Sequence, residues 1–146
     1  MNILHGSFIL FITALLPLTC SAQKASSTNI GADKNGVHRA LLSTIELTNM
    51  KGFNFTSLTV ELKPGVVVPS HQHEAFVFVY VLEGQVVSQI NKQAAVVYTA
   101  GDHWLEQPGD SHSKTQNPNE DKAAKLLVIF VARDSAKLMT SGEVPK

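Results

Sequence analysis

The sequence predicts an all-β fold, either a sandwich or a barrel. Short apolar runs alternate with clusters of Gly, Pro, Asn and Asp along most of the chain, a pattern typical of short strands joined by turns. After residue 22 no stretch carries the apolar period of an amphipathic helix. The 146 residues are enough for one domain with a buried core and too few for two.

The composition excludes several classes of protein. The chain is 44% hydrophobic and 16% charged, which suits a globular protein better than a disordered one. Its 12 basic and 12 acidic residues give a net charge of +0. We therefore expect no nucleic-acid partner and no binding to an anionic membrane surface.

Residues 1–22 are predicted to be a secretory signal peptide. They contain no Lys, Arg, Asp or Glu, and Ile3 to Leu18 is almost wholly apolar. Small residues follow and favour cleavage after Ala22, although the leading residues lack the usual Lys or Arg. A membrane anchor is the alternative, but the apolar run is short and ends near Pro17. We expect a secreted or periplasmic protein that makes no membrane contact once the signal is removed.

The single cysteine, Cys20, lies inside this segment. A lipoprotein signal would also place a Cys here, but Pro17, Leu18 and Thr19 fit the residues before a lipidated Cys poorly. With cleavage after Ala22, the mature chain has no disulfide and no thiol to act as nucleophile or metal ligand.

The remaining chain divides into a leader, a β-domain and a tail. Residues 23–36 are polar and without period, so we expect a flexible leader. The domain is expected over residues 37–133, and residues 134–146 should form a tail with at most one helical turn, around residues 135–139. The strands are expected at residues 41–48, 53–62, 66–68, 75–82, 85–90, 94–99, 103–106, 111–116 and 125–131.

Two of these strands carry further detail. The alternation in residues 53–62 slips by one near Ser57, which predicts a bulge or kink. Residues 75–82 and 85–90 flank Glu83-Gly84, which predicts a hairpin.

His71 and His73 are two residues apart, so on a strand both imidazoles project from one face. Two neutral imidazoles on a buried face leave polar atoms unsatisfied unless something binds them, and a metal ion is the usual partner.

Two motifs together resemble the cupin superfamily. Gly65-x5-His71-x-His73, followed by an apolar strand that ends in Gly84, is similar to the first cupin motif. Gly101 and Pro108-Gly109-x-x-His112, with Asn117 beyond, are similar to the second. The resemblance covers about residues 51–131 and implies a double-stranded β-helix, the jelly-roll cupin barrel, with a divalent metal inside.

The same resemblance implies the ligands His71, His73 and His112. The family's carboxylate ligand falls on Val77, which cannot coordinate a metal. The second motif also departs from the family's pattern. Gln107 stands where the family has the first Pro of this motif, and Asn117 lies one position later than the family's Asn.

Two carboxylates are candidates to replace the ligand missing at position 77. Glu74 falls on the opposite strand face from the histidines and is disfavoured. Glu106 lies near the turn that leads to His112. Three roles are open for it: a fourth ligand, a general base, or simply a solvated or hydrogen-bonded carboxylate. Its direction cannot be read from the sequence.

Three histidines can hold Fe, Zn, Mn, Ni or Cu and leave positions open for substrate and O₂. Some cupin dioxygenases resemble this three-His pattern, so the first hypothesis is an exported small-molecule metalloenzyme, an oxidoreductase of the dioxygenase type. The rival is a non-catalytic cupin that binds a metal or small ligand. A third hypothesis is an interaction module with a vestigial site, whose histidines are only hydrogen-bonded.

Apolar residues on both faces of two strands predict a homodimer. If Val77, Val79 and Val81 face the barrel, then Phe78, Tyr80 and Leu82 face outwards, and residues 125–131 are apolar on both faces as well. The other aromatic residues, Trp104 among them, are expected in the core or an interface. His38 and His103 are expected at the surface or in turns.

Overall fold

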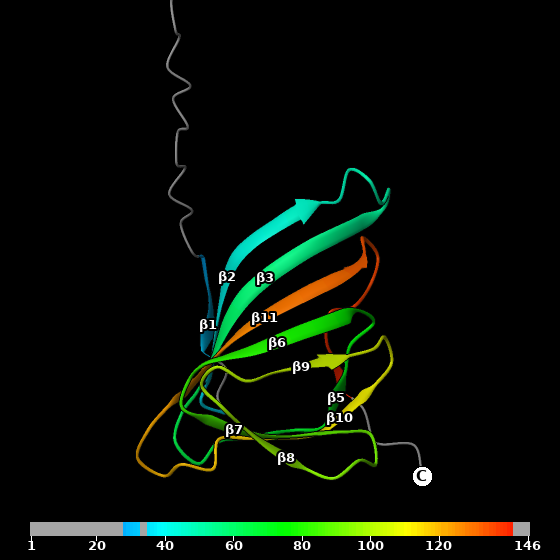
Figure 1. The fold of residues 1–146 in the computed structure, drawn as a ribbon. Helices are drawn as coiled ribbons and strands as arrows, with labels where there is room; N and C mark the ends of the chain where they lie inside the picture. The colour runs from blue at the N-terminus through cyan, green and yellow to red at the C-terminus, as the bar shows by residue number, and fades with distance from the viewer. Residues whose placement is uncertain (1–27, 33–34, 142–146) are drawn as a thin grey trace, which may run out of the picture.

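The computed structural model describes residues 28–32 and 35–141 and shows two six-stranded sheets facing each other (Figure 1). The segment predicted as a signal peptide, residues 1–22, lies outside the described residues. Within them there is no helix long and apolar enough to cross a membrane.

The described residues form twelve strands. Their bounds are β1 Thr28–Ala32, β2 Val37–Glu46, β3 Phe53–Leu62, β4 Val67–Val68, β5 His71–Gln72, β6 Phe76–Glu83, β7 Gln85–Ile90, β8 Val96–Thr99, β9 His103–Glu106, β10 Ser111–Gln116, β11 Ala124–Arg133 and β12 Thr140–Ser141.

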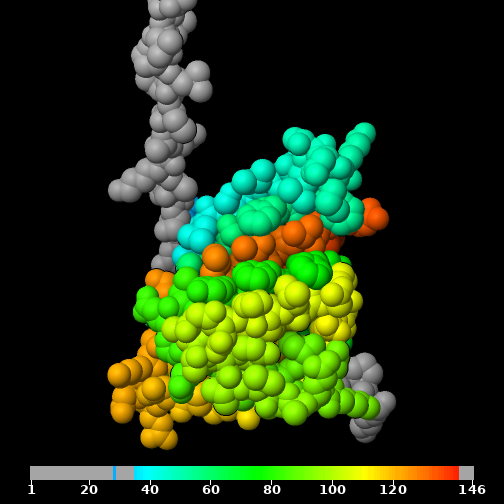
Figure 2. Space-filling model, viewed as in Figure 1, coloured from blue at the N-terminus to red at the C-terminus, as the bar shows by residue number. Residues whose placement is uncertain are grey.

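The strand order is that of a jelly roll. One sheet runs β1-β2-β3-β11-β6-β9 and the other β12-β5-β10-β7-β8, with β4 also paired to β10. All pairings are antiparallel, and neighbours such as β3 and β11 are far apart in the sequence. Figure 2 shows β3, β11, β6 and β9 lying side by side. The predicted all-β jelly-roll barrel is confirmed.

The core lies between the two sheets and follows the alternation of the strands. Val77, Val79 and Val81 of β6 are buried, whereas Phe78 and Tyr80 are half-buried on the outer face, as the sequence predicted. Strand β11 alternates in the same way, with Leu126, Val128 and Phe130 inside.

The predicted hairpin at Glu83-Gly84 is wrong. Strand β6 belongs to the first sheet and β7 to the second, so the chain turns a corner between sheets at this point. Gly84 has a φ of +76°, and a Cβ there would lie 2.8 Å from the Ala123 carbonyl oxygen. Glycine is therefore needed for the corner. A two-residue link looks the same in sequence whether the strands pair or diverge.

The slip near Ser57 does correspond to a bulge, but the extra residue is on the neighbouring strand. Strand β3 pairs with β11 without interruption. Its register with β2 shifts between Leu41 and Ser43, which pair with Leu58 and Ser57. Leu42 is thus the unpaired residue of β2.

Both ends of the domain extend further than the sequence predicted. Strand β1 pairs with β2 and lies within residues 23–36, which were expected to be a flexible leader. Strand β12 pairs with β5 and lies within the expected tail. Both strands are short and lack an apolar alternation, so their pairing depends on the open edge of a sheet.

Candidate metal centre

The structure brings His71, His73 and His112 together. His71 on β5 is the direct cross-strand partner of His112 on β10, and His73 follows one residue after β5. The three side chains are 7%, 6% and 4% exposed, respectively. One possible ligand atom from each lies within 4.8 Å of the others, so a single ion can be reached by all three after small side-chain adjustments.

Hydrogen bonds fix which nitrogen of two rings is available. The Nδ1 of His71 donates to the Pro69 carbonyl oxygen at 2.8 Å, and the Nδ1 of His73 donates to the Leu138 carbonyl oxygen. A carbonyl only accepts, so each Nδ1 carries the proton and each neutral ring keeps its Nε2 lone pair for a metal.

His112 is held by hydroxyl groups instead. Its Nε2 lies 2.8 Å from the Ser88 Oγ on β7 and 2.8 Å from the Thr115 Oγ1 on β10. Its Nδ1 faces Glu106 at 3.3 Å. A hydroxyl can either accept from Nε2–H or donate to an unprotonated Nε2, so these contacts are compatible with both tautomers, and Nδ1 is available as the donor atom in the tautomer that carries its proton on Nε2.

Burial keeps the three imidazoles neutral. It lowers the pKa of His73 to about 4, against the hydrogen bond to Leu138. It lowers the pKa of His112 to about 3, with further lowering by His71 and His73. The pKa of His71 is also lowered, mainly by burial. Neutral imidazole is the form that binds metals.

Glu106 joins the cluster from strand β9 and is not solvated. It is 2% exposed and lies directly opposite Val77 in the β6–β9 ladder. The residue that faces position 77 on the neighbouring strand is therefore a buried carboxylate. The Nε1–H of Trp104 donates to its Oε1 at 2.9 Å and fixes its orientation.

The second oxygen of Glu106 has no hydrogen-bond partner. Oε2 is buried and unsatisfied, and it lies 3.6 Å from the Nε2 of His73. Burial raises the pKa of Glu106 to about 7 while it lowers those of the histidines, so these close contacts are not ion pairs at neutral pH in the absence of metal.

The donor set fits a divalent transition metal. Two imidazole lone pairs, a third ring nitrogen and an orphaned carboxylate oxygen converge in a buried place. Such nitrogen and oxygen donors suit Fe, Zn, Mn, Ni or Cu, and a cation would satisfy the Oε2 atom that the protein leaves unpaired.

The remaining candidates lie outside the cluster. Glu74 is exposed and accepts a hydrogen bond from the Lys137 backbone N–H at 3.0 Å, as the strand-face argument predicted. His103 is exposed and stacks on Phe78. His38 is half-buried on β2, in a strand rather than a turn.

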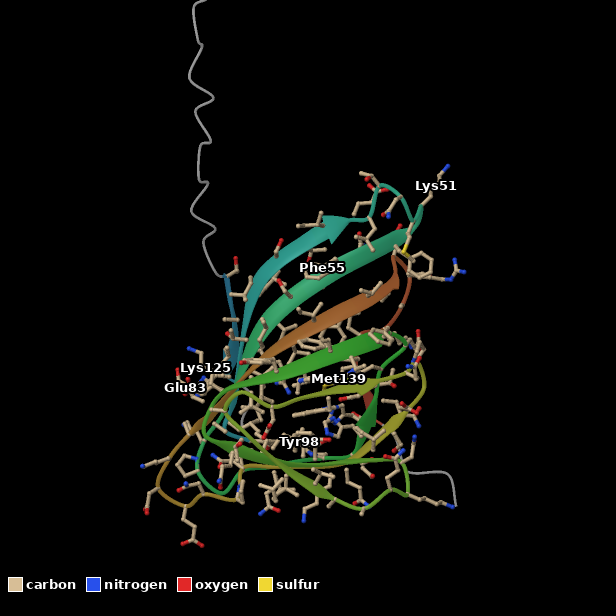
Figure 3. All side chains as sticks on the ribbon, in the orientation of Figure 1. Lys51, Phe55, Glu83, Tyr98, Lys125 and Met139 are labelled. Carbon is tan, nitrogen blue, oxygen red and sulfur yellow. The ribbon has the colours of Figure 1, made fainter. Side chains whose placement is uncertain are left out.

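A cavity of about 190 Å³ opens beside the three histidines. Its wall is aliphatic and aromatic over most of its area and includes Met139, labelled in Figure 3. The volume is below the ~300–1,000 Å³ of pockets for drug-sized ligands, so the cavity suits a small molecule.

A family model described as a cupin domain matches residues 58–130, half of the chain. The chain belongs to the cupin family. The matched range contains the three histidines, Val77 and Glu106, so this is a small cupin that has Val at the family's usual carboxylate position. No functionally curated protein matches the chain significantly.

Solved structures show the same fold. An RmlC-like cupin from Shewanella frigidimarina is 19% identical, with a TM-score of 0.57 over 78% of this chain and 89% of that one. A predicted oxalate decarboxylase from Thermotoga maritima is 24% identical, with a TM-score of 0.56 over 75% and 94%. The polyketide cyclase RemF from Streptomyces resistomycificus is 18% identical, with a TM-score of 0.56 over 83% and 84%. At these identities the likeness concerns the cupin fold alone.

Sequence reasoning missed the residues that support the ligands. Ser88, Thr115 and the Leu138 carbonyl orient the histidines, and Trp104, expected as a core or interface aromatic, orients Glu106. Alternation indicates that Trp104 and Glu106 share a face, but not which face of β9 is inside. The contacts of Ser88 and Leu138 join segments distant in sequence. Thr115 lies three residues after His112 on the same strand, where simple alternation would put the two on opposite faces, and the register shift between His112 and Lys114 is not visible in the sequence.

Proposed function

We propose that this cupin binds one divalent transition metal, Fe, Zn, Mn, Ni or Cu, through His71, His73 and His112, with Glu106 as fourth ligand, and is a small-molecule metalloenzyme. The observation that carries the proposal is the cluster of three buried imidazoles beside the Glu106 carboxylate, whose Oε1 faces His112 and whose Oε2, near His73, has no hydrogen-bond partner. Such an oxygen is costly to bury unless a cation satisfies it.

The reaction we propose is an oxidation by O₂. A bound redox-active metal would supply activation of O₂ or of the substrate at its open coordination positions. The residues of the chain would hold the ion, in part through Nε2 of His71 and His73, and line the adjacent cavity with mostly apolar side chains. The named activities of the neighbours, a predicted oxalate decarboxylase and a polyketide cyclase, show that the fold does not select the reaction.

The second candidate is a cupin that binds a metal or small ligand without catalysis. One observation favours it. Among the described residues that line the cavity, Arg39 is the one ionisable side chain besides the proposed ligands. No separate acid–base pair of described residues therefore faces the cavity.

Oxygen uptake separates the two candidates. Protein loaded anaerobically with Fe(II) is mixed with thiols, β-diketones and phenols in an oxygen electrode, with a metal-loaded His103→Ala variant as control for surface histidines. An enzyme gives catalytic uptake with at least one class, abolished in His112→Ala. Uptake with no class, in protein that retains its iron, supports the binder.

We also propose that the mature protein is exported, to the periplasm or outside the cell. The support is the uncharged apolar stretch before Ala22. The mass of the mature protein should correspond to a chain that begins at Gln23, and a full-length cytoplasmic product would contradict export.

A further inference from the structure

Arg39 places a positive charge in the wall of the cavity. It lies on β2 directly opposite Val60 of β3, and both residues line the cavity. Val37, two residues earlier on β2, also lines it. The alternation of the strand therefore turns Val37 and Arg39 to the same, inner face.

Arg39 is close enough to the histidine cluster to interact electrostatically with His71. Besides burial, the positive charge of Arg39 is among the causes that lower the pKa of His71. Arg39 is the one Lys or Arg side chain in the wall formed by the described residues. Most of that wall is apolar, including Val60, Leu126 and Phe130, and so offers a charged group little solvation.

The charges of the cavity leave an excess that an anion would balance. With a metal bound, the charge of the divalent ion by itself exceeds the single negative charge of Glu106. The three histidines would bind the ion as neutral imidazoles and add no charge. A low-dielectric cavity with a net positive charge favours an anionic ligand over a neutral one of the same shape.

We propose that Arg39 determines specificity and selects a small organic acid, whose carboxylate lies between the guanidinium and the metal and whose hydrocarbon body fills the apolar part of the cavity. This inference rests on the proposed function, because it needs the metal. A guanidinium carries several N–H donors in a planar fork that matches a carboxylate, so it can hold a wall contact and a ligand together.

The apolar wall distinguishes a carboxylic acid from other anions that arginine binds. Inorganic phosphate has no apolar surface and would leave the aliphatic lining around Val60, Leu126 and Phe130 in contact with water or empty. A branched or aromatic acid covers that lining while its head group meets Arg39. The cavity of about 190 Å³ limits the acid to a small one.

The test uses zinc-loaded protein and two isosteres, isovalerate and isovaleramide, with inorganic phosphate as third probe. Trp104 is the single tryptophan and lines the cavity, so its fluorescence reports binding, and calorimetry provides a second readout. Zinc content is measured in every sample before titration. We expect isovalerate to bind about 10- to 100-fold more tightly than the amide, as for a hydrogen bond to a charged group, and more tightly than phosphate.

Variants assign the preference to Arg39. Arg39→Gln should remove the preference for the acid while zinc remains bound, and Arg39→Lys should retain part of it. Arg133→Gln is the matched control, because Arg133 is exposed and stacks on Phe53 away from the cavity wall. If Arg39→Gln does not fold, the wild-type comparison of acid with amide and the Lys variant still decide the question.

The outcomes separate the inference from the proposed function. Wild-type protein that binds zinc but treats acid and amide alike, or binds neither, overturns the role of Arg39 and leaves the metal site standing. Equal loss of preference in Arg133→Gln also overturns it, as does tighter binding of phosphate. Absence of zinc from the wild-type protein overturns the proposed function itself.

Discussion

At the scale of single residues, Glu106 faces Val77 across the β6–β9 ladder and brings a buried carboxylate to His73 and His112, where we propose that it replaces the carboxylate missing from position 77. The three histidines could be predicted from sequence because His71 and His73 share a strand and the second motif has a fixed spacing to His112. The role of Glu106 could not be predicted, because it depends on which residue of β9 faces Val77. That pairing is set by the register of strands, not by local pattern.

Exchange of the two facing residues tests this replacement. Glu106→Val should lower the affinity for zinc by at least about tenfold, because a charged ligand is lost. The double variant Val77→Glu, Glu106→Val moves the carboxylate back to β6 and should recover most of the affinity. Calorimetric titration with zinc measures both, and Glu74→Gln, which removes an exposed carboxylate, is the control. Undiminished zinc affinity in Glu106→Val would show that Glu106 is not a ligand.

Glu106 also gives the metal-free protein a defined pH dependence. Burial raises its pKa to about 7 in the folded state from 4.5, so the folded protein holds a proton that the unfolded chain has released. This contribution to stability is complete below pH 4.5 and is lost as the pH rises through about 7. The histidines act in the opposite sense, since their lowered pKa values remove stability as the pH falls below 6.5.

Urea unfolding in the presence of a chelator isolates the carboxyl group. The free energy of unfolding of wild type, relative to Glu106→Gln, should fall progressively between about pH 4.5 and about pH 7 and level off above that range, because glutamine does not ionise. A difference that stays constant over this range would contradict a raised pKa for Glu106.

At the scale of elements, strand positions were predicted well and strand partners poorly. The predicted bounds of β3, β7, β9 and β10 agree with the structure, because alternation and turn residues are local signals. The predicted hairpin at Gly84 was wrong because β6 pairs with β11 and β9, and not with β7, the next strand in the sequence. Strand β12 was missed for the same reason, since its partner β5 is far away in the sequence.

The segment after β11 supports the histidine cluster directly. The Leu138 carbonyl accepts the Nδ1–H of His73, and Thr140 and Ser141 pair with the strand that carries His71. A chain that ends at Arg133 should keep its β-sheet circular dichroism but bind zinc about 10- to 100-fold more weakly, the effect expected when a contact that orients a ligand is lost.

The matched control for this truncation ends at Ser141. It retains β12 and the Leu138 carbonyl and should bind zinc like the full chain. Equal affinity of the two truncated chains would show that residues 134–141 do not support the site.

At the scale of the whole molecule, the barrel was predictable and its assembly remains a prediction. Two motifs in order within an all-strand chain were sufficient for the fold, because each position in them is constrained by the metal or by a turn. The outer face of the first sheet carries Phe78, Tyr80 and Ile129, half-buried, and Leu105, 51% exposed. We propose that this face forms a homodimer.

Light scattering at micromolar concentration tests the dimer. Wild type should have twice the mass of one chain, and Leu105→Lys, which places a charge opposite Phe78, should shift the mass towards the monomer. Lys51→Glu is the control, because Lys51 lies at the exposed tip of the β2–β3 connection (Figure 3). A monomeric wild-type mass would contradict the interface.

The metal content of the protein purified from its native compartment tests the central claim most directly. Elemental analysis should find about one equivalent of a single transition metal in wild type and in His103→Ala, whose histidine is exposed, and much less in His71→Ala. Less than about a tenth of an equivalent in wild type, or a content that His71→Ala leaves unchanged, would contradict the account of this barrel as a metal-binding cupin.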